Sequence, residues 1–159
     1  MKFVSIKIYD KKTILIKEGQ LSDKLFFIID GCMRAYYIKE EKEITDWFGY
    51  ENEFICAINS YFLEIPSPHF IETIGSATLM VIQRKDADYL CNKFHDFERL
   101  SRFAVTKTML QLQQRVVSLQ FETAQQRFDN LLAIRPDITL RFPLGHIASY
   151  LGNIQNQKS

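Results

Sequence analysis

The chain lacks the long apolar runs and the charge excess that identify several classes of protein. No stretch of its 159 residues approaches the ~18 consecutive apolar residues of a membrane-spanning helix, and no signal-peptide pattern follows Met1. The 20 Lys and Arg residues against 19 Asp and Glu residues give a net charge of +1, so no bulk attraction draws the chain to nucleic acid or acidic membranes. We expect a cytoplasmic protein without membrane contact, whose anion binding is local.

Cysteine and histidine are too few and too scattered for the usual metal and redox sites. The cysteines are Cys32, Cys56 and Cys91, and the histidines are His69, His95 and His146. Because there is no C-x-x-C pair, we expect buried free thiols, and two thiols inside one domain do not complete an iron–sulfur site. Because there is no H-x-H pair, we expect no metal site, no other cofactor and no enzymatic activity.

Short runs of β-branched and aromatic residues, separated by Gly, Pro and Asp turn signals, fill the first half of the chain. The runs are Thr13–Ile16, Leu25–Ile29, Cys32–Ile38, Ile44–Phe48, Phe54–Ala57, Phe70–Ile74 and Leu79–Ile82. No helical period connects them. Seven short strands with regular turns predict an antiparallel sandwich or jelly roll rather than a parallel sheet.

The apolar period then changes to that of helices. Asp86 is a candidate N-cap for a short helix that ends at Phe94, and residues 97–121 contain neither Gly nor Pro, which predicts one long helix. Phe103, Leu110 and Val117 form one apolar stripe on it, and a second stripe consists of Val105, Met109, Leu112, Val116 and Leu119. We expect one stripe to pack on the β unit and the other on a partner chain, the alternative being a single helix in a monomer's groove.

A small helical module follows the long helix. Thr123 and Gln126 have the spacing of a capping box, Pro136 ends that helix near Arg135, and residues 139–142 read as an extended link. Pro143 then begins a final helix with apolar residues at helical spacing, namely Leu144, Ile147, Ala148 and Leu151. Gly152 is the turn glycine after it. Residues 153–159 could supply only about 10 Å of a further helix at ~1.5 Å per residue.

The order of elements and several local motifs resemble the Crp/Fnr superfamily of bacterial transcription regulators. The motifs are Ile16–Gln20 with Lys24–Gly31, Lys42–Phe48 with Glu51–Phe54, and Pro143–Gly152. The resemblance implies an α+β fold: an antiparallel β-roll (double-stranded β-helix or jelly roll), a long dimerisation helix and a partial winged helix-turn-helix. It implies a sensor domain over residues 1–94, a dimer helix over 95–121 with Phe103, Leu110 and Val117 at its seam, and an incomplete DNA-binding module over 122–159.

The expected ligand pocket departs from the cyclic-nucleotide sensors of this family. Those proteins hold the phosphate with an arginine, whereas residues 43–83 contain no Lys or Arg and six acids. By this resemblance Ser67 and His69 lie where the arginine segment would be, and Glu51 matches the family's glutamate. The pocket candidates are Glu51, Asn52, Ser67, His69 and Gln113. We expect an unknown effector that is not cyclic AMP. The alternative interpretation of the six acidic residues is that they lie on loops and on the outer faces of strands, away from the pocket.

The DNA-reading residues are also sparse. The candidates are Ser149, Gln155, Asn156 and Lys158, and Lys158 is the only cation after Arg141. Without several phosphate contacts even non-specific affinity for DNA is low. The sequence therefore predicts a homodimeric Crp/Fnr-type transcription regulator with weak or absent DNA reading. The alternative is a ligand-binding or dimerisation protein without DNA-binding activity.

Overall fold

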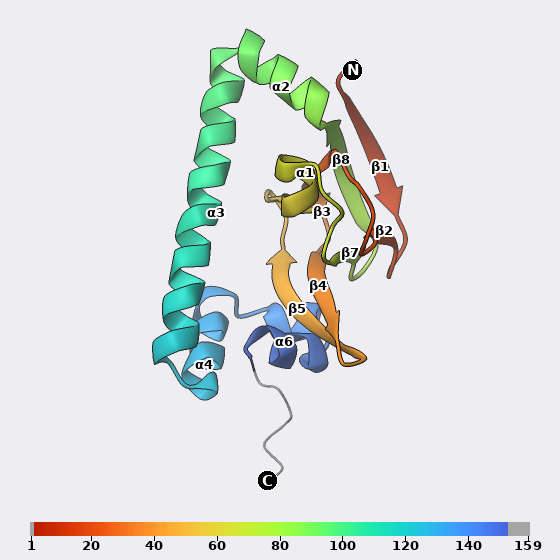
Figure 1. The fold of residues 1–159 in the computed structure, drawn as a ribbon. Helices are drawn as coiled ribbons and strands as arrows, with labels where there is room; N and C mark the ends of the chain where they lie inside the picture. Colours follow the sequence, from red (N-terminus) through yellow and green to blue (C-terminus); the bar gives the residue numbers. More distant parts are fainter. Residues whose placement is uncertain (1, 153–159) are drawn as a thin grey trace.

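Two four-stranded antiparallel sheets form a β-roll, and helices follow it along one side and at one end (Figure 1). This computed structural model describes residues 2–152. The strands are β1 (Val4–Tyr9), β2 (Ile14–Ile16), β3 (Lys24–Asp30), β4 (Met33–Lys39), β5 (Lys42–Gly49), β6 (Phe54–Cys56), β7 (Phe70–Thr73) and β8 (Ala77–Gln83). One sheet has the order β1-β8-β3-β6 and the other β2-β7-β4-β5.

The space between the sheets holds the main apolar core. Inward-facing residues alternate along the strands, so that Phe26 and Ile28 of β3 are buried, as are Leu79 and Val81 of β8. The pairing of Phe26 with Val81 fixes the register, because a slip of one residue would turn every apolar side chain to the other face.

Each of the seven predicted strands is present, and two elements of the first half of the chain were missed. The first is β1, an edge strand whose Ile6 and Ile8 are exposed, which leaves it outside the pattern of buried runs. The second is helix α1 (Ile58–Leu63), which has six residues and is too short for a helical period to be recognised. The mixed fold of antiparallel sheets with a long helix is as the sequence predicts.

Helices α2 (Arg84–Lys93) and α3 (His95–Phe121) meet at the single residue Phe94. Asp86 is wrong as an N-cap, since Gln83 is the cap and Asp86 lies in the first turn. The 27 residues of α3 span about 40 Å at 1.5 Å per residue. No residue of α3 is buried, so the expectation that one of its stripes packs on the roll is wrong, and both stripes are exposed in the single chain.

The C-terminal module consists of α4 (Ala124–Ile134), α5 (Ile138–Arg141) and α6 (Leu144–Tyr150). The capping box of Thr123 and Gln126 is confirmed, with both reciprocal hydrogen bonds present. The extended link over 139–142 is wrong: the backbone forms a helical turn because the Phe142 N–H bonds the Ile138 carbonyl. Pro143 is the N-cap of α6 rather than its first helical residue.

The module and the roll share a second apolar cluster. Ile138 and Ile147 of the module are almost fully buried, and the Phe142 ring lies 4.2 Å from the Phe48 ring of β5. Figure 1 shows α6 against the β4–β5 end of the roll. The module's core is therefore partly made by residues of the β-roll. Within residues 2–152, no helix combines the length and apolar character that crossing a membrane requires.

Candidate functional site

A cavity of about 230 Å³ lies between the roll and α3. Its walls are Phe27, Trp47, Asn52, Glu53, Phe54, Leu100, Phe103, Ala104, Lys107, Thr108 and Gln111. Four of these side chains are aromatic, and the polar ones come from α3 and from the loop between β5 and β6. A concave, mostly apolar surface with a few polar groups is typical of a small-molecule site.

Helix α3 contributes one continuous face to this cavity. Ala104, Lys107, Thr108 and Gln111 follow one another at i, i+3, i+4 and i+7, the spacing that brings helical side chains onto one face. The predicted Gln113 lies two residues after Gln111, about 200° around the helix, and is exposed away from the cavity. Gln111 therefore occupies the place on the cavity wall that was predicted for Gln113.

The β5–β6 loop, residues 50–53, forms the opposite wall. Asn52 lines the cavity in the left-handed region at φ +66°, and its N–H donates to the Ile28 carbonyl at 2.8 Å. Glu53 Oε2 accepts from the Tyr50 N–H at 3.1 Å. Glu53 Oε1 lies 3.3 Å from Arg135 Nη2 and 4.0 Å from Lys107 Nζ. Glu53 thus stands between a cation of α3 and the arginine that caps α4.

Glu51, in the same loop, pairs with the C-terminal module. Arg141 Nη1 donates to Glu51 Oε2 at 2.8 Å, Arg141 Nη2 donates to Oε1, and the Gly31 N–H donates to Oε1 at 3.2 Å. The hydrogen bond from Arg141 lowers the pKa of Glu51 to about 2. The predicted ligand contact at Glu51 is therefore a structural bond to α5, and Glu51 does not line the cavity.

Two further arginine contacts join the module to α3 and to the β5–β6 loop, and a third lies within the module. The Arg135 guanidinium stacks 3.8 Å from the Tyr50 ring centroid, and Arg115 of α3 stacks 3.8 Å from the Tyr150 ring. Arg127 Nε donates to the Leu151 carbonyl at 2.7 Å. These contacts use the planar guanidinium both for stacking and for hydrogen bonding.

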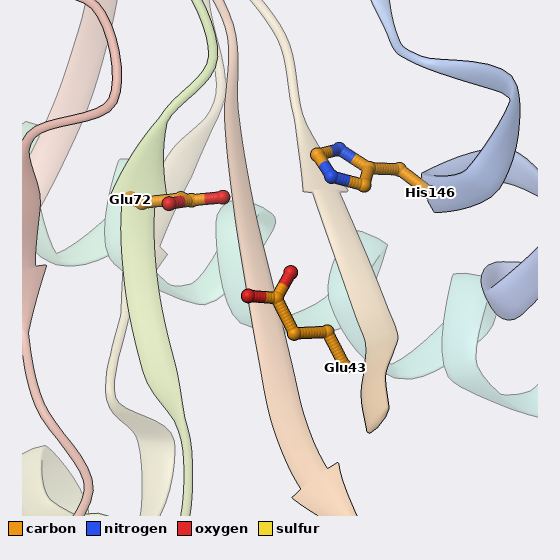
Figure 2. Close-up of side chains that lie close together, drawn as sticks. All are labelled: Glu43, Glu72 and His146. Atoms are coloured by element: carbon orange, nitrogen blue, oxygen red, sulfur yellow. The ribbon is translucent and has the colours of Figure 1, made fainter. Parts of the chain in front are cut away.

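A cluster of charged side chains on the roll lies next to α6, with Arg34 and Glu72 buried and Glu43 exposed. Figure 2 shows Glu43, Glu72 and His146 pointing toward one another, and their ligand atoms lie within 4.8 Å of each other. Arg34, 2% exposed, donates through Nε to Glu72 at 2.6 Å and through Nη2 to Glu43. Its Nη1 donates to Thr45 Oγ1 at 3.1 Å.

This donor set resembles a metal site only in its residue types. The Arg34 guanidinium already supplies the positive charge that both carboxylates need, and a second cation beside it would be repelled. Burial lowers the pKa of His146, and the charge of Arg34 lowers it further. The cluster is therefore an ion-pair network within the sheet, with the His146 ring of α6 beside it, in a region where the sequence shows acidic residues and no cation. Arg34 lies nine residues before the cation-free segment and was overlooked for that reason.

Ser67 and His69 lie outside the cavity. The Ser67 hydroxyl donates to the His69 carbonyl at 2.8 Å, and the buried His69 ring packs edge-on against Tyr37 at 5.2 Å. Neither His69 ring nitrogen has a hydrogen-bond partner among the described residues, and burial lowers the pKa of this imidazole. Both residues pack within the roll.

The remaining predicted residues divide by element. Phe103, Leu110 and Val117 are exposed along α3, and Phe103 also lines the cavity. Ser149 Oγ accepts from the Thr45 N–H at 3.0 Å, so it contacts the roll. The candidates Gln155, Asn156 and Lys158 lie outside the described residues.

The three cysteines are free thiols. Cys32 is buried, whereas Cys56 and Cys91 are partly buried. Burial raises the pKa of the Cys32 thiol to about 11 and that of Cys56 to about 12. Thiols with raised pKa values are poor nucleophiles, so these two act as packing groups.

Lys107 lines the cavity and is not among the pocket residues predicted from the sequence. The expected pocket cation would lie within residues 43–83, whereas Lys107 is on α3. The sequence does contain an indication of this position. Lys107 follows Phe103 by four residues and so shares its helix face, on a helix that was expected to lie against the roll.

Comparison with known proteins gives structural but not sequence matches. No family model matches the chain, and no curated protein matches it significantly. A mutant of CooA from Carboxydothermus hydrogenoformans has a TM-score of 0.73 at 22% identity, covering 95% of this chain and 71% of that one. FixK2 from Bradyrhizobium japonicum has a TM-score of 0.78 at 15% identity, covering 94% and 77%. The catabolite activator protein of Thermus thermophilus has a TM-score of 0.62 at 16% identity, covering 84% and 65%.

At these identities the likeness establishes the fold. The similar structures are those of Crp/Fnr regulators and of cyclic nucleotide-binding domains, including one such domain from Methylobacillus flagellatus with a TM-score of 0.62. The fold expected from the sequence motifs is therefore confirmed at the level of β-roll and long helix.

Proposed function

We propose that this chain is a cytoplasmic, homodimeric transcription regulator of the Crp/Fnr type that binds a small effector between its roll and α3 and acts without catalysis. In this proposal residues 1–94 sense the effector, residues 95–121 pair with a second copy, and residues 122–159 belong to the DNA-binding module. The shared fold with CooA, FixK2 and the catabolite activator protein supports the family.

One observation carries the proposal: the β5–β6 loop belongs to the cavity and to the module's attachment at the same time. Asn52 and Glu53 line the cavity, while Glu53 contacts Arg135 and Glu51 contacts Arg141. A ligand that shifts this loop changes the partners of both arginines. That is the arrangement a sensor needs, because an effector acts only through contacts that differ between two states.

The exposed stripes of α3 support pairing with a second copy. Phe103 is 67% exposed and Leu110 59% exposed, and Val117 continues the same line. Large apolar side chains lying exposed along a helix of about 40 Å are stabilised when a like helix covers them. Because Phe103 is also a cavity wall, a partner helix on this seam would adjoin the cavity.

The charges around the cavity argue against cyclic AMP. Lys107 is the only cation among the described lining residues, it is half-exposed, and Glu53 stands 4.0 Å from it. No arginine of the described chain lines the cavity, so a phosphate would lack the forked, charge-assisted contact that arginine provides. The effector is therefore proposed to be something other than a cyclic nucleotide.

A second candidate is a ligand-binding dimer that does not read DNA. It is favoured by the docking of α6 on β5, where Thr45 donates to Ser149 and Phe48 contacts Tyr150. A module whose α6 is fixed in this way serves protein contacts rather than the reading of a DNA groove. Under this reading the module is an interaction surface of the sensor.

Fluorescence anisotropy at low salt separates the two candidates. The labelled duplex is the DNA upstream of this protein's own coding sequence, and the competitor is a scrambled duplex of equal composition. The regulator predicts tighter binding to the upstream duplex, lost in a dimer-breaking Leu110→Glu variant and kept in the matched Gln113→Glu variant. Equal binding to both duplexes would contradict the regulator and favour the second candidate.

A further inference from the structure

We propose that the cavity accepts a small, mostly apolar carboxylate, such as an aryl-alkanoic acid, and that Lys107 recognises the carboxylate. This inference rests on the proposed function, because it names the ligand class of the effector cavity. The observation behind it is that the Lys107 ammonium, which has few partners, lies at the rim of a cavity with aromatic walls.

The walls and the volume set the size and character of the ligand. Phe27, Trp47, Phe54 and Phe103 supply four aromatic faces, and Leu100 adds an aliphatic one. A volume of about 230 Å³ is below the ~300–1,000 Å³ of sites for drug-sized molecules, so a fragment-sized molecule fits. Aromatic walls favour a flat apolar body, whose ring can stack or pack edge-on.

The polar residues at the rim of the cavity determine which ligand charge the cavity favours. Lys107 Nζ has only one ion-pair partner among the described residues, Glu53 Oε1 at 4.0 Å, which leaves ammonium donors for a ligand. When Lys107 binds the ligand instead of Glu53, the Glu53 carboxylate still accepts hydrogen bonds from the Tyr50 N–H and from Arg135. A monoanion matches one ammonium, whereas a phosphate dianion would meet one cation and the nearby Glu53 carboxylate.

The rim also argues against a cationic ligand. Four aromatic faces could attract an ammonium group, but Lys107 would repel it and Glu53 already pairs with Arg135. Asn52, Thr108 and Gln111 complete the rim with neutral donors and acceptors that can orient a carboxylate.

The single tryptophan of the chain, Trp47, lines the cavity and gives a direct optical readout. Trp47 emission is titrated with phenylacetate, its neutral isostere phenylacetamide, phenyl phosphate, cyclic AMP and trimethylphenylammonium. We expect phenylacetate to shift the emission saturably, and to bind about tenfold more tightly than the amide, as for one charge-assisted hydrogen bond at a half-exposed site. Lys107→Met should abolish the preference for the carboxylate, Lys107→Arg should keep it, and the exposed Lys85→Met of α2 is the matched control.

Each outcome bears on the ligand class. The proposed ligand class would be overturned by equal binding of amide and carboxylate, or by tighter binding of phenyl phosphate, cyclic AMP or the ammonium compound. It would also be overturned if phenylacetate gave no saturable response at millimolar concentration. Sedimentation of the same samples separates this failure from that of the proposed function. A dimer that ignores carboxylates overturns only the ligand class, whereas a monomer that binds them overturns only the proposed homodimer.

Discussion

Arg141 Nη1 donates a 2.8 Å hydrogen bond to Glu51 Oε2, and its Nη2 donates to Oε1 of the same carboxylate. This two-pronged contact joins α5 of the module to the β5–β6 loop, one residue from Asn52 on the cavity wall. The position of the module is thus coupled to the loop that a ligand touches.

The Glu51–Arg141 pair predicts an acid-sensitive contribution to stability. The pKa of Glu51 in the fold is about 2, below its ordinary 4.5, so the stabilisation is complete above pH 4.5 and is lost as the pH falls toward 2. Solvent screening at this partly exposed pair limits its contribution to about 1–2 kcal/mol. Urea unfolding of Glu51→Gln should show that loss at pH 7 and a shallower fall in acid, with the exposed Glu18→Gln as control. An unchanged acid profile would contradict this account of the pair.

The β4–β5 turn carries strain that a substitution can remove. Glu40 and Glu41 both adopt the left-handed region, at φ +50° and +60°, as a two-residue hairpin turn of this hand requires. Asn-Gly suits that backbone, so the double change Glu40→Asn and Glu41→Gly should raise the free energy of unfolding by about 1 kcal/mol. Changing both residues to Gln removes the charges but keeps the strained backbone. Equal stabilisation by the Gln pair would show that charge, not backbone conformation, is responsible.

His69 should destabilise the roll in mild acid. Its ring is buried without a hydrogen-bond partner among the described residues, and burial lowers its pKa from 6.5, although Asp46 partly opposes this. Because the unfolded chain takes up the proton first, the stability associated with His69 is present above pH 6.5 and falls below it. His69→Phe keeps the edge-on contact with Tyr37 and should stabilise the protein by about 1 kcal/mol at neutral pH.

Thermal unfolding between pH 5 and 7.5 measures both effects of His69→Phe. The melting temperature of the variant should change less with pH than that of the parent. The exposed His95→Gln on α3 should leave the profile as it is. A variant as sensitive to acid as the parent would place the titrating group elsewhere.

Much of the fold followed from local patterns, and the exceptions have physical causes. Alternating strands and the gap-free helical period of residues 97–121 identify the roll and α3, because each element buries or presents one face. The helical turn of α5 was missed because Ile138 is buried against Phe48, Tyr50 and Cys32, a tertiary contact that overrides the extended tendency of its neighbours.

The site was less accessible from sequence, since its parts come from distant segments. Asn52 was placed near a ligand from its motif, and it lines the cavity. Glu51 was given the same role but is bound by Arg141, 90 residues later, a pairing that no local pattern encodes. Lys107 and Gln111 could have been found by following the helical face of Phe103 rather than searching the β segment for a cation.

The most direct test of a paired sensor is the mass of the protein in solution. Sedimentation equilibrium at tens of micromolar should give twice the chain mass of 18.7 kDa for the parent and for Gln113→Glu. Leu110→Glu places a carboxylate on the exposed seam of α3 and should give the single-chain mass, with the helix content of the parent by circular dichroism. A parent protein that sediments as a monomer of 18.7 kDa would contradict the account.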